Sequence, residues 1–317
     1  MRKTEIIFKR NTNFMLHGYV WKPECKPVGV IQVIHGMTEY IGRYEEFAAH
    51  FTDLGYVVCG FDLESHGKSI PIHHKDSGLY IHCWDDLIAD VEMLRIKIRR
   101  QYPEIPYVML GFSLGSFVLR SHQCIYPKTA NKLIYIGTGQ PKMNELKFAH
   151  WIVKTLCKKD DQPSKLVKKL AFDNYNRKFK HSKNGIDWLL KDEKAQEDYL
   201  SDKRVVMDMT PRFFLQFLNG MMKIQSNEHW LYYKNDVLFI AGEEDPVSCG
   251  LPEVLKRYRR AGARITKKII SGYRHDVLHD SCKEKVFQCI EKFFIVVRER
   301  SKIRKGNIIC RYYHSNQ

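Results

Sequence analysis

The segment Val108-Met109-Leu110-Gly111-Phe112-Ser113-Leu114-Gly115-Ser116 decides the expected fold of this chain. A short apolar run ends in Gly-x-Ser-x-Gly, and the pattern over residues 117–126 predicts a helix. A strand, a sharp turn and a helix around this motif hold a serine in a strained backbone conformation with its hydroxyl exposed. Gly111 and Gly115 are small enough to let the strand and the helix approach each other. A turn without any chemistry is the alternative, so the partners of Ser113 decide between the two interpretations.

The composition is typical of a folded α/β protein. The chain has 317 residues, of which 44% are hydrophobic and 12% aromatic, enough for one large core. Its 52 Lys and Arg residues against 36 Asp and Glu give a net charge of +16. Such a charge suits nucleic acid, an anionic membrane or a solvated surface, but the sequence has no zinc-finger spacing, base-reading helix or RNA-binding signature. We therefore expect no nucleic-acid partner and leave peripheral contact with an anionic membrane open.

Cysteine usage and the lack of targeting segments favour the cytoplasm as the compartment of this protein. The nine cysteines are scattered and never form a Cys-x-x-Cys pair, which is typical of reduced thiols rather than disulfides. We expect no metal and no cofactor, because the His and Cys residues lack ligand spacing. Residues 1–10 lack the apolar segment of a secretory signal, and no apolar run approaches membrane-spanning length. The sequence predicts a cytoplasmic, soluble protein.

Strands and helices alternate along most of the chain. Residues 6–8 and 14–21 predict an antiparallel pair, and the near-continuous apolar run at 28–34 predicts a strand buried on both faces of a parallel sheet. Further helices are expected at 44–54, 84–100, 252–260 and 283–297, and further strands at 56–61, 133–136, 237–241 and 265–270. This alternation predicts an α/β fold with a mostly parallel central sheet flanked by helices.

The alternation stops between residues 138 and 230. That stretch is rich in Lys and has helical patterns without an obvious buried strand. We interpret residues 138–230 as an inserted helical cap in a core made of residues 1–137 and 231–297. Residues 298–317 are expected to form a basic C-terminal tail of unknown purpose.

Two segments of the predicted cap have apolar stripes at helical spacing. Thr210 at the N-cap and Pro211 at the first helical position predict the start of one helix. The two stripes are Phe213, Phe214, Phe217, Leu218, Met221 and Met222, and Phe148, Trp151, Ile152 and Leu156. Such stripes serve plain packing more often than ligand binding. The functional interpretation is an apolar roof for an acyl chain, with these substrate-binding residues: Phe213, Phe214, Phe217 and Trp151.

A serine nucleophile needs a base to accept its proton and a carboxylate to orient that base. In parallel sheets of this kind the three groups follow in the order nucleophile, acid and histidine, each just past a strand. Glu243, Glu244 and Asp245 follow one of the last predicted strands. We choose Asp245, because Pro246 stiffens its turn, whereas solvation explains the two glutamates equally well.

The base and the oxyanion donors complete the predicted site. His275 lies in the loop after the last predicted strand and is the expected base, with His279 as the alternative. The oxyanion needs backbone donors, which we assign to the amides of Leu114 and Met37. His35, beside a glycine, is expected to shape its loop rather than act as a second base.

Several motifs together resemble the monoglyceride lipase and lysophospholipase branch of the α/β-hydrolase superfamily, a group also classed with the serine aminopeptidase-like hydrolases. They are His35-Gly36-Met37-Thr38-Glu39-Tyr40, Gly42-Arg43-Tyr44, Asp62, His66-Gly67-Lys68-Ser69, Gly111-Phe112-Ser113-Leu114-Gly115-Ser116, Gly242-Glu243-Glu244-Asp245-Pro246-Val247 and Tyr273-Arg274-His275-Asp276. The resemblance runs in order from about residue 5 to 297. It implies an α/β-hydrolase fold and a carboxylic ester hydrolase that forms an acyl-enzyme on Ser113 with a monoacylglycerol or a lysophospholipid.

The same resemblance implies the roles given above for Ser113, Asp245, His275, Met37 and Leu114. Two stretches depart from the family's pattern. Asp62-Leu63-Glu64-Ser65-His66-Gly67 replaces the usual Asp-x-Arg-Gly-His-Gly, and Tyr40-Ile41 stands where His-Ser is common. Both departures affect loop packing and leave the three catalytic positions in place.

Two other functions stay open at this point. One keeps the fold and changes the bond, as in an aminopeptidase-like enzyme or a thioesterase. The other is a non-catalytic homologue that binds a ligand in the hydrolase cavity. Acyl-chain length, head group, cap position and oligomeric state are not encoded in these motifs.

Overall fold

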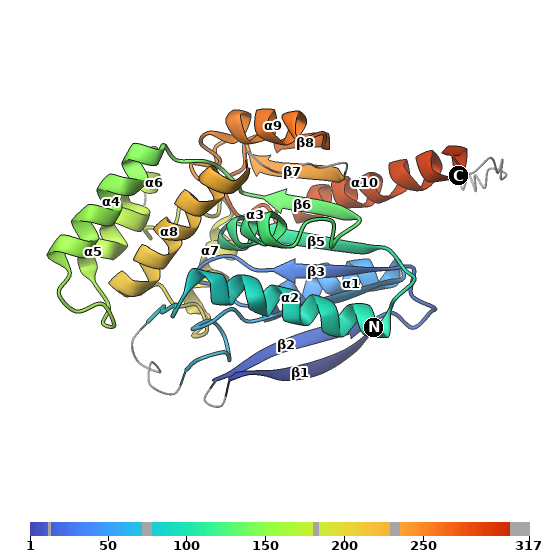
Figure 1. The fold of residues 1–317 in the computed structure, drawn as a ribbon, viewed down its shortest axis with the longest axis horizontal. Helices are drawn as coiled ribbons and strands as arrows, with labels where there is room; N and C mark the ends of the chain where they lie inside the picture. The colour runs from blue at the N-terminus through green and yellow to red at the C-terminus, as the bar shows by residue number, and fades with distance from the viewer. Residues whose placement is uncertain (12–13, 72–77, 180–183, 229–234, 305–317) are drawn as a thin grey trace.

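The computed structural model describes residues 1–11, 14–71, 78–179, 184–228 and 235–304. Its centre is an eight-stranded sheet of order β1-β2-β4-β3-β5-β6-β7-β8 (Figure 1). The strands are β1 (Arg2–Asn11), β2 (Phe14–Lys22), β3 (Gly29–Ile34), β4 (Tyr56–Phe61), β5 (Tyr107–Phe112), β6 (Lys132–Ile136), β7 (Asp236–Gly242) and β8 (Arg264–Ile270). The β1–β2 and β2–β4 pairs are antiparallel, and the other pairs are parallel. This topology confirms the predicted α/β-hydrolase fold.

Helices cover both faces of the sheet. The elements are α1 (Glu45–Asp53), preceded by the short η1 (Ile41–Tyr44), α2 (Trp84–Gln101), α3 (Leu114–Ile125), α9 (Leu251–Arg260) and α10 (Lys283–Arg304). Alternate strand residues point to opposite faces, so Val30 packs with α2 and α3 whereas Ile31 packs with α1 and α10. This two-sided burial is the reason that the strands appear in the sequence as unbroken apolar runs.

The described residues between β6 and β7 contain several helices, joined by loops. They are α4 (Met143–Leu156), α5 (Lys165–Lys168), the π-helical turn η3 (Lys169–Asp173), α6 (Asn174–Asn176), α7 (Glu193–Ser201) and α8 (Pro211–Asn227). The hydroxyl of Thr210 accepts a hydrogen bond from the amide of Phe213 at 3.1 Å, so α8 begins with the predicted cap. The division into core and cap remains our interpretation of this helical insertion.

The last helix is longer than the sequence predicts. Helix α10 continues beyond the predicted end at residue 297 to Arg304, and residues 305–317 of the predicted tail lie outside the described residues. Eight cysteines are described, and all of them are free thiols. Within the described ranges, no helix combines the length and the apolar character needed to cross a membrane.

A buried ion cluster ties the end of α8 to the two helices next to it. Arg120 of α3 donates from Nε and Nη2 to the Glu228 carboxylate at 2.7 and 2.8 Å, and Arg257 of α9 donates to the same carboxylate at 2.8 Å. Burial raises the pKa of Glu228, but Arg120 and Arg257 lower it more, so the net shift is downward. The residue after α8 is therefore fixed as an anion between two cations.

We expect Glu228→Gln to destabilise the protein by about 3–5 kcal/mol, because it leaves the buried guanidinium of Arg120 and the partly buried one of Arg257 without their carboxylate. Urea unfolding followed by circular dichroism measures the effect. Glu197→Gln, at an exposed position on α7, is the control and should change stability by less than about 0.5 kcal/mol. Equal midpoints for the two variants would contradict the structural role of the cluster.

Candidate active site

Ser113 occupies the turn between β5 and α3. Its backbone angles, φ +50° and ψ −118°, lie outside the regions that L-residues prefer, a strain of about 1–3 kcal/mol. The turn is held by a hydrogen bond from the Ser113 amide to the Ile136 carbonyl at 2.9 Å. The Ser116 amide and hydroxyl donate to the Ser113 carbonyl at 2.8 and 2.6 Å. The strained turn predicted from the sequence is confirmed.

The two flanking glycines are required by close backbone contacts. A Cβ atom on Gly115 would lie 2.0 Å from the carbonyl oxygen of Ile34, and one on Gly111 would lie 2.4 Å from that of Gly115. Any side chain at these positions would separate α3 from the strands. The glycines thus bring the start of α3 against the ends of β3 and β5.

The structure brings Ser113, Asp245 and His275 together. The distance between His275 Nε2 and Ser113 Oγ is 2.7 Å, and that between His275 Nδ1 and Asp245 Oδ1 is 2.8 Å. These residues follow β5, β7 and β8, whose carboxyl ends lie at one edge of the parallel sheet. A carboxylate accepts only, so Nδ1 carries the hydrogen, and Nε2 of the neutral ring is free to accept the serine proton.

Further donors hold Asp245 in its orientation. The Val247 amide donates to Asp245 Oδ1 at 2.9 Å, and the Ser248 hydroxyl donates to Oδ2 at 2.6 Å. Burial raises the pKa of Asp245, but His275 and these hydrogen bonds lower it more, and the net shift is downward. The carboxylate therefore stays ionised while it orients the imidazole.

The alternative residues lie elsewhere. Glu243 accepts hydrogen bonds from Ser271 and Gly272 at 2.8 Å each, and it is exposed. Glu244 contacts the guanidinium of Arg274 at 3.9 Å. His279 is bonded to Asp276 through Nδ1 at 2.8 Å rather than to the serine. No contact joins either glutamate to His275 among the described residues. The histidine that contacts Ser113 is His275.

The imidazole of His275 is enclosed on several sides. The ring of Phe112 lies 5.1 Å from it between centroids, and the ring of Trp188 lies 5.3 Å from it. A Cβ atom on Gly137, where φ is +61°, would lie 2.6 Å from His275 Cε1. The backbone also fixes the loop, because the His275 amide donates to the Trp188 carbonyl at 3.3 Å. Trp188 comes from the insertion, so the predicted cap forms part of the imidazole's surroundings.

The expected oxyanion donors lie in adjacent backbone segments. Ile34 at the end of β3 pairs with Gly111 of β5, which places the loop containing Met37 beside the turn at Ser113. Leu114 is the first residue of α3, where backbone amides have no intrahelical acceptor. Within the described part of the chain, neither the Met37 nor the Leu114 amide donates a hydrogen bond to another residue. Their role as oxyanion donors remains a prediction.

His35 and Thr38 shape the loop around Met37. His35 Nδ1 bonds the Gly36 carbonyl at 2.7 Å, and its Nε2 accepts from the Leu63 amide at 2.9 Å. Burial, and then the nearby His66, hold the pKa of His35 well below its usual value, so the ring is neutral. Thr38 has φ +64° and bonds the carbonyl of Met37. His35 therefore has the loop-shaping contacts that we expected.

The two departures from the family's pattern make ordered contacts. The Ile41 amide donates to Asp62 Oδ1 at 2.8 Å, and the Tyr40 hydroxyl donates to Asp202 just after α7. Glu64 pairs with Arg10 of β1 at 2.7 Å. Each changed residue thus has a partner within this chain.

The proposed substrate-binding side chains have different surroundings. Phe213 and Phe214 are buried in the main hydrophobic core, and Phe217 packs against Trp84 and Phe117 with ring centroids 6.2 and 5.8 Å apart. Packing therefore accounts for the α8 stripe. Trp151 is 60% exposed and stacks on Phe148 of the same helix. Acyl-chain binding by these four residues remains a prediction.

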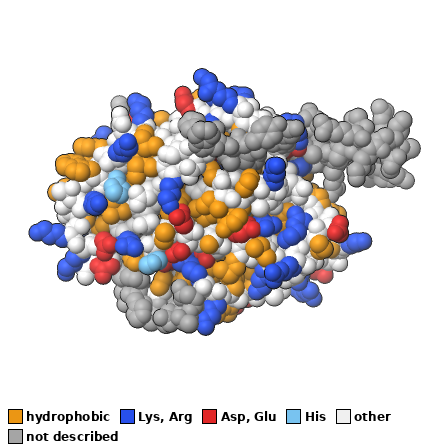
Figure 2. All heavy atoms as spheres, in the orientation of Figure 1, with side chains coloured by type: hydrophobic (Ala, Val, Ile, Leu, Met, Phe, Trp, Pro, Cys, Tyr) orange, Lys and Arg blue, Asp and Glu red, His pale blue; other side chains and the backbone are white. Residues whose placement is uncertain are grey.

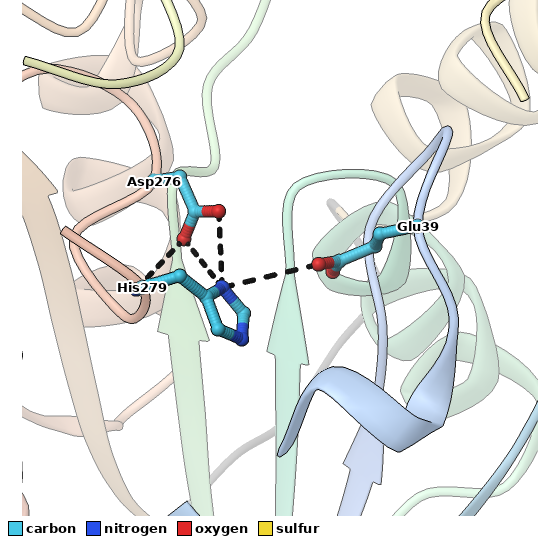
Figure 3. Close-up of side chains that lie close together, drawn as sticks. All are labelled: Glu39, Asp276 and His279. Atoms are coloured by element: carbon cyan, nitrogen blue, oxygen red, sulfur yellow. Dashed lines mark hydrogen bonds and ion pairs between the residues drawn. The ribbon is translucent and has the colours of Figure 1, made fainter. Parts of the chain in front are cut away.

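Beside the triad lie Glu39 and Asp276, for which the sequence predicted no role, and His279, the alternative base. Figure 3 shows Asp276 and His279 from the loop after β8 and Glu39 from the loop after β3. Each offers an atom of a kind that binds metal ions, and these atoms lie within 4.8 Å of one another. However, Arg43 donates to Glu39 at 2.6 Å and to Asp276 at 3.4 Å. A cation of the chain itself already satisfies the two carboxylates. The signals in the sequence are that Glu39, Arg43 and Asp276 fall within the quoted motifs, and that Glu39 and Arg43 have i, i+4 spacing.

A surface groove of about 700 Å³ lies between β8 and α10. Its lining residues are Asp236 and residues within 264–271 and 285–293, which include Arg264, Lys285 and Lys292. The groove is separate from the side chains around Ser113.

The comparisons with known proteins agree with this architecture. The sequence model of the family described as "Serine aminopeptidase, S33" matches residues 25–282. A monoacylglycerol lipase from Mycolicibacterium smegmatis is 28% identical over 120 residues, which cover 37% of this chain and 40% of that protein. Monoglyceride lipase from Mus musculus is 31% identical over 98 residues, 31% of each chain. The aligned segments thus span less than half of these relatives.

Solved structures match over nearly the whole chain. A carboxyl esterase from Bacillus coagulans has a TM-score of 0.84 at 24% identity and covers 93% of this chain and 98% of its own. A soluble variant of monoglyceride lipase from Saccharomyces cerevisiae, in complex with a substrate analogue, has a TM-score of 0.70 at 17% identity, with 91% and 93% covered. At these identities the likeness shows the fold alone.

The enclosure of His275 generates a prediction about Gly137. We expect Gly137→Ala to slow the reaction of Ser113 with a fluorophosphonate by about 100-fold, because the new methyl group displaces the imidazole. Gly185→Ala is the matched control, since Gly185 has φ +73° but nothing within 4 Å of an added Cβ. It should lose about 1–2 kcal/mol of stability and keep the labelling rate. Equal labelling rates for the two variants would show that Gly137 does not constrain the ring.

Proposed function

Because the chain belongs to the Serine aminopeptidase, S33 family, we propose that it is a serine hydrolase that cleaves carboxylic esters of lipid-like substrates. The observation that carries the proposal is the continuous hydrogen-bonded series Ser113–His275–Asp245, with distances of 2.7 and 2.8 Å. Nucleophile, base and orienting acid are all present, which favours an enzyme over a non-catalytic binding protein.

In the proposed first half-reaction, Ser113 Oγ attacks the ester carbonyl as its proton passes to His275 Nε2. Asp245 stabilises the resulting imidazolium through Nδ1 without taking the proton. The amides of Met37 and Leu114 donate to the oxygen that becomes negative. His275 then gives its proton to the leaving alcohol, and the acyl group remains on Ser113.

In the second half-reaction, a water molecule takes the place of the alcohol. His275 accepts its proton, the oxygen attacks the acyl carbonyl, and the proton returns to Ser113 as the carboxylic acid leaves. The enclosed ring favours this double use of one base, because Phe112 and Trp188 keep the imidazole in one orientation.

We propose a monoacylglycerol or a lysophospholipid as the substrate. Support comes from the relatives, which include a monoacylglycerol lipase, monoglyceride lipases and the phospholipase YtpA of Bacillus subtilis. The family's description as a serine aminopeptidase favours an amidase as the second candidate. Rates with monoacylglycerols, lysophospholipids, acyl thioesters and amino-acid anilides, compared on one preparation, separate these substrate classes.

We expect Ser113→Ala to lower kcat on the preferred ester by about a million-fold, because the nucleophile is lost. Asp245→Asn should lower kcat by about ten-thousand-fold, since an amide favours the wrong tautomer of His275. Glu243→Gln is the control, because Glu243 lies on the same loop and contacts Ser271 instead. Near-normal turnover by Ser113→Ala would refute the acyl-enzyme mechanism.

We also propose that the protein works in the cytoplasm and contacts anionic membranes through α4. Helix α4 exposes Phe148, Trp151 and Leu156 by 61%, 60% and 64%, and the two aromatic rings stack. Exposed lysines surround them at positions 142, 147, 154, 158 and 159. Hydrophobic side chains and lysines lie together at this end of the molecule in Figure 2, where Figure 1 has α4 and α5. Aromatic residues among lysines suit the interface of an anionic membrane.

The membrane proposal predicts a specific loss of binding. The double variant Phe148→Ser with Trp151→Ser should bind anionic vesicles at least about tenfold more weakly, because two large apolar side chains no longer enter the interface. Sedimentation with vesicles containing phosphatidylserine measures the effect. Ile125→Ser is the control, as Ile125 is 52% exposed at the end of α3. Unchanged binding of the double variant, or equal binding of wild type to neutral vesicles, would exclude this surface.

A further inference from the structure

Arg43 lies where three distant parts of the chain meet beside the triad. It comes from η1, directly after the loop that contains Met37. Its side chain is only 13% exposed and reaches both the loop after β8 and a helix of the insertion.

The first contact holds the loop of the proposed oxyanion donor. Arg43 Nη1 donates to Glu39 Oε2 at 2.6 Å. Glu39 Oε1 in turn accepts from the Gly36 amide at 2.5 Å and from the Tyr44 hydroxyl at 2.9 Å. The Glu39 carboxylate therefore bridges Arg43 to the backbone of the residue just before Met37.

The second contact holds the loop of the proposed base. Arg43 Nη1 also donates to Asp276 Oδ2 at 3.4 Å, and Asp276 directly follows His275 in the chain. His279 Nδ1 lies 2.8 and 3.0 Å from the two Asp276 oxygens, so it donates to them. Asp276 is thus bound by Arg43 and by His279, and Figure 3 shows its contact with His279.

The third contact involves the insertion. The guanidinium carbon of Arg43 lies 4.8 Å from the ring centroid of Tyr199, a buried residue of α7. The Tyr199 hydroxyl bonds the Thr38 hydroxyl, next to Met37. In addition, the Asp276 amide donates to the Leu189 carbonyl at 2.8 Å. The insertion therefore supports both of the loops that Arg43 joins.

His279 and Arg43 both stabilise the charge of Asp276. Burial raises the pKa of Asp276, but His279 and then Arg43 lower it more, and the net value is about 2. Glu39 and Asp276 are 2% and 1% exposed, so both carboxylates are shielded from water. Without the guanidinium, two buried carboxylates on separate loops would face each other with only His279 between them, and their repulsion would separate the loops.

We propose that Arg43 is a positioning residue, which holds the loop of residues 36–39 and the loop of residues 275–279 at a fixed separation. The Met37 amide and the His275 imidazole then act on the same substrate carbonyl. This inference rests on the proposed function, because it concerns the geometry of that reaction. Catalytic groups displaced by about 1 Å typically lose about 100-fold in rate, so a loosened contact should lower kcat.

The chain offers a closely matched control in Arg10. Its side chain is also 13% exposed, and it also bridges two buried carboxylates, Glu64 at 2.7 Å and Asp90 at 2.9 Å. Arg10 lies in β1, which pairs only with β2 among the described strands, and its contacts are with Glu64, Asp86, Asp90 and Phe14. Arg10→Met thus reproduces the loss of a buried cation away from the two loops.

The experiment compares Arg43→Met, Arg43→Lys and Arg10→Met with wild type. The concentration of active enzyme used to calculate kcat is the concentration of molecules that a fluorophosphonate labels at completion. Unfolded protein is not labelled and therefore does not lower the measured kcat. We expect Arg43→Met to lower kcat by about 10- to 100-fold with KM changed by less than about threefold. Arg43→Lys should recover part of kcat because it restores the charge without the planar fork. Arg10→Met should keep kcat within about twofold, although it unfolds at a lower temperature.

A double variant separates positioning from stability. In Arg43→Met with Asp276→Asn, one of the two uncompensated carboxylates is neutral, so thermal stability should recover relative to Arg43→Met alone. The contact between the loops is still missing, so kcat should stay low. If Arg43→Met alone does not fold, the kcat of this double variant tests the positioning role in its place.

Three results would overturn the inference. They are a wild-type kcat in Arg43→Met, an equal loss of kcat in Arg43→Met and Arg10→Met, and full recovery of kcat in the double variant. If wild type hydrolyses no ester, the proposed function fails, but the rate of fluorophosphonate labelling still tests the positioning role by the same comparisons. Wild-type protein that is neither active nor labelled would overturn both proposals.

Discussion

The hydrogen bond between Ser113 Oγ and His275 Nε2, 2.7 Å long, joins residues that lie far apart in the sequence. It depends on the parallel sheet, because parallel strands end at one edge and deliver the residues that follow them to the same place. It also depends on a strained serine backbone, which close approach of α3 to β3 and β5 maintains. If either constraint were relaxed, the hydroxyl and the imidazole would separate, and the proposed proton transfer would stop.

Buried arginine–carboxylate clusters fix helix ends and loops that are not hydrogen-bonded to the sheet. Glu228 joins the end of α8 to α3 and α9, and Arg43 joins the two loops at the triad. Such clusters are costly to desolvate, and replacing them with apolar residues is often neutral for stability. Their value lies in geometry, since a guanidinium donates in fixed directions and an apolar contact does not.

The insertion between β6 and β7 contributes residues to the surroundings of the site. Trp188 packs against the imidazole of His275, and Tyr199 bonds Thr38 in the loop of the proposed oxyanion donor. Movement of this insertion would therefore change the surroundings of both proton transfer and oxyanion stabilisation. The exposed stripe of α4 lies on the same insertion, which connects the proposed membrane contact with the active site through one continuous part of the chain.

The sequence by itself determined the local features: the strained turn at Ser113, the buried strands as unbroken apolar runs, and the order in which Asp245 and His275 follow. These features depend on neighbours in the chain, so periodicity and glycine placement predict them. Only the tertiary structure decided between His275 and His279, buried the α8 stripe while exposing that of α4, and gave Arg43 its partners. These outcomes depend on which distant surfaces come into contact, and no local pattern carries that information.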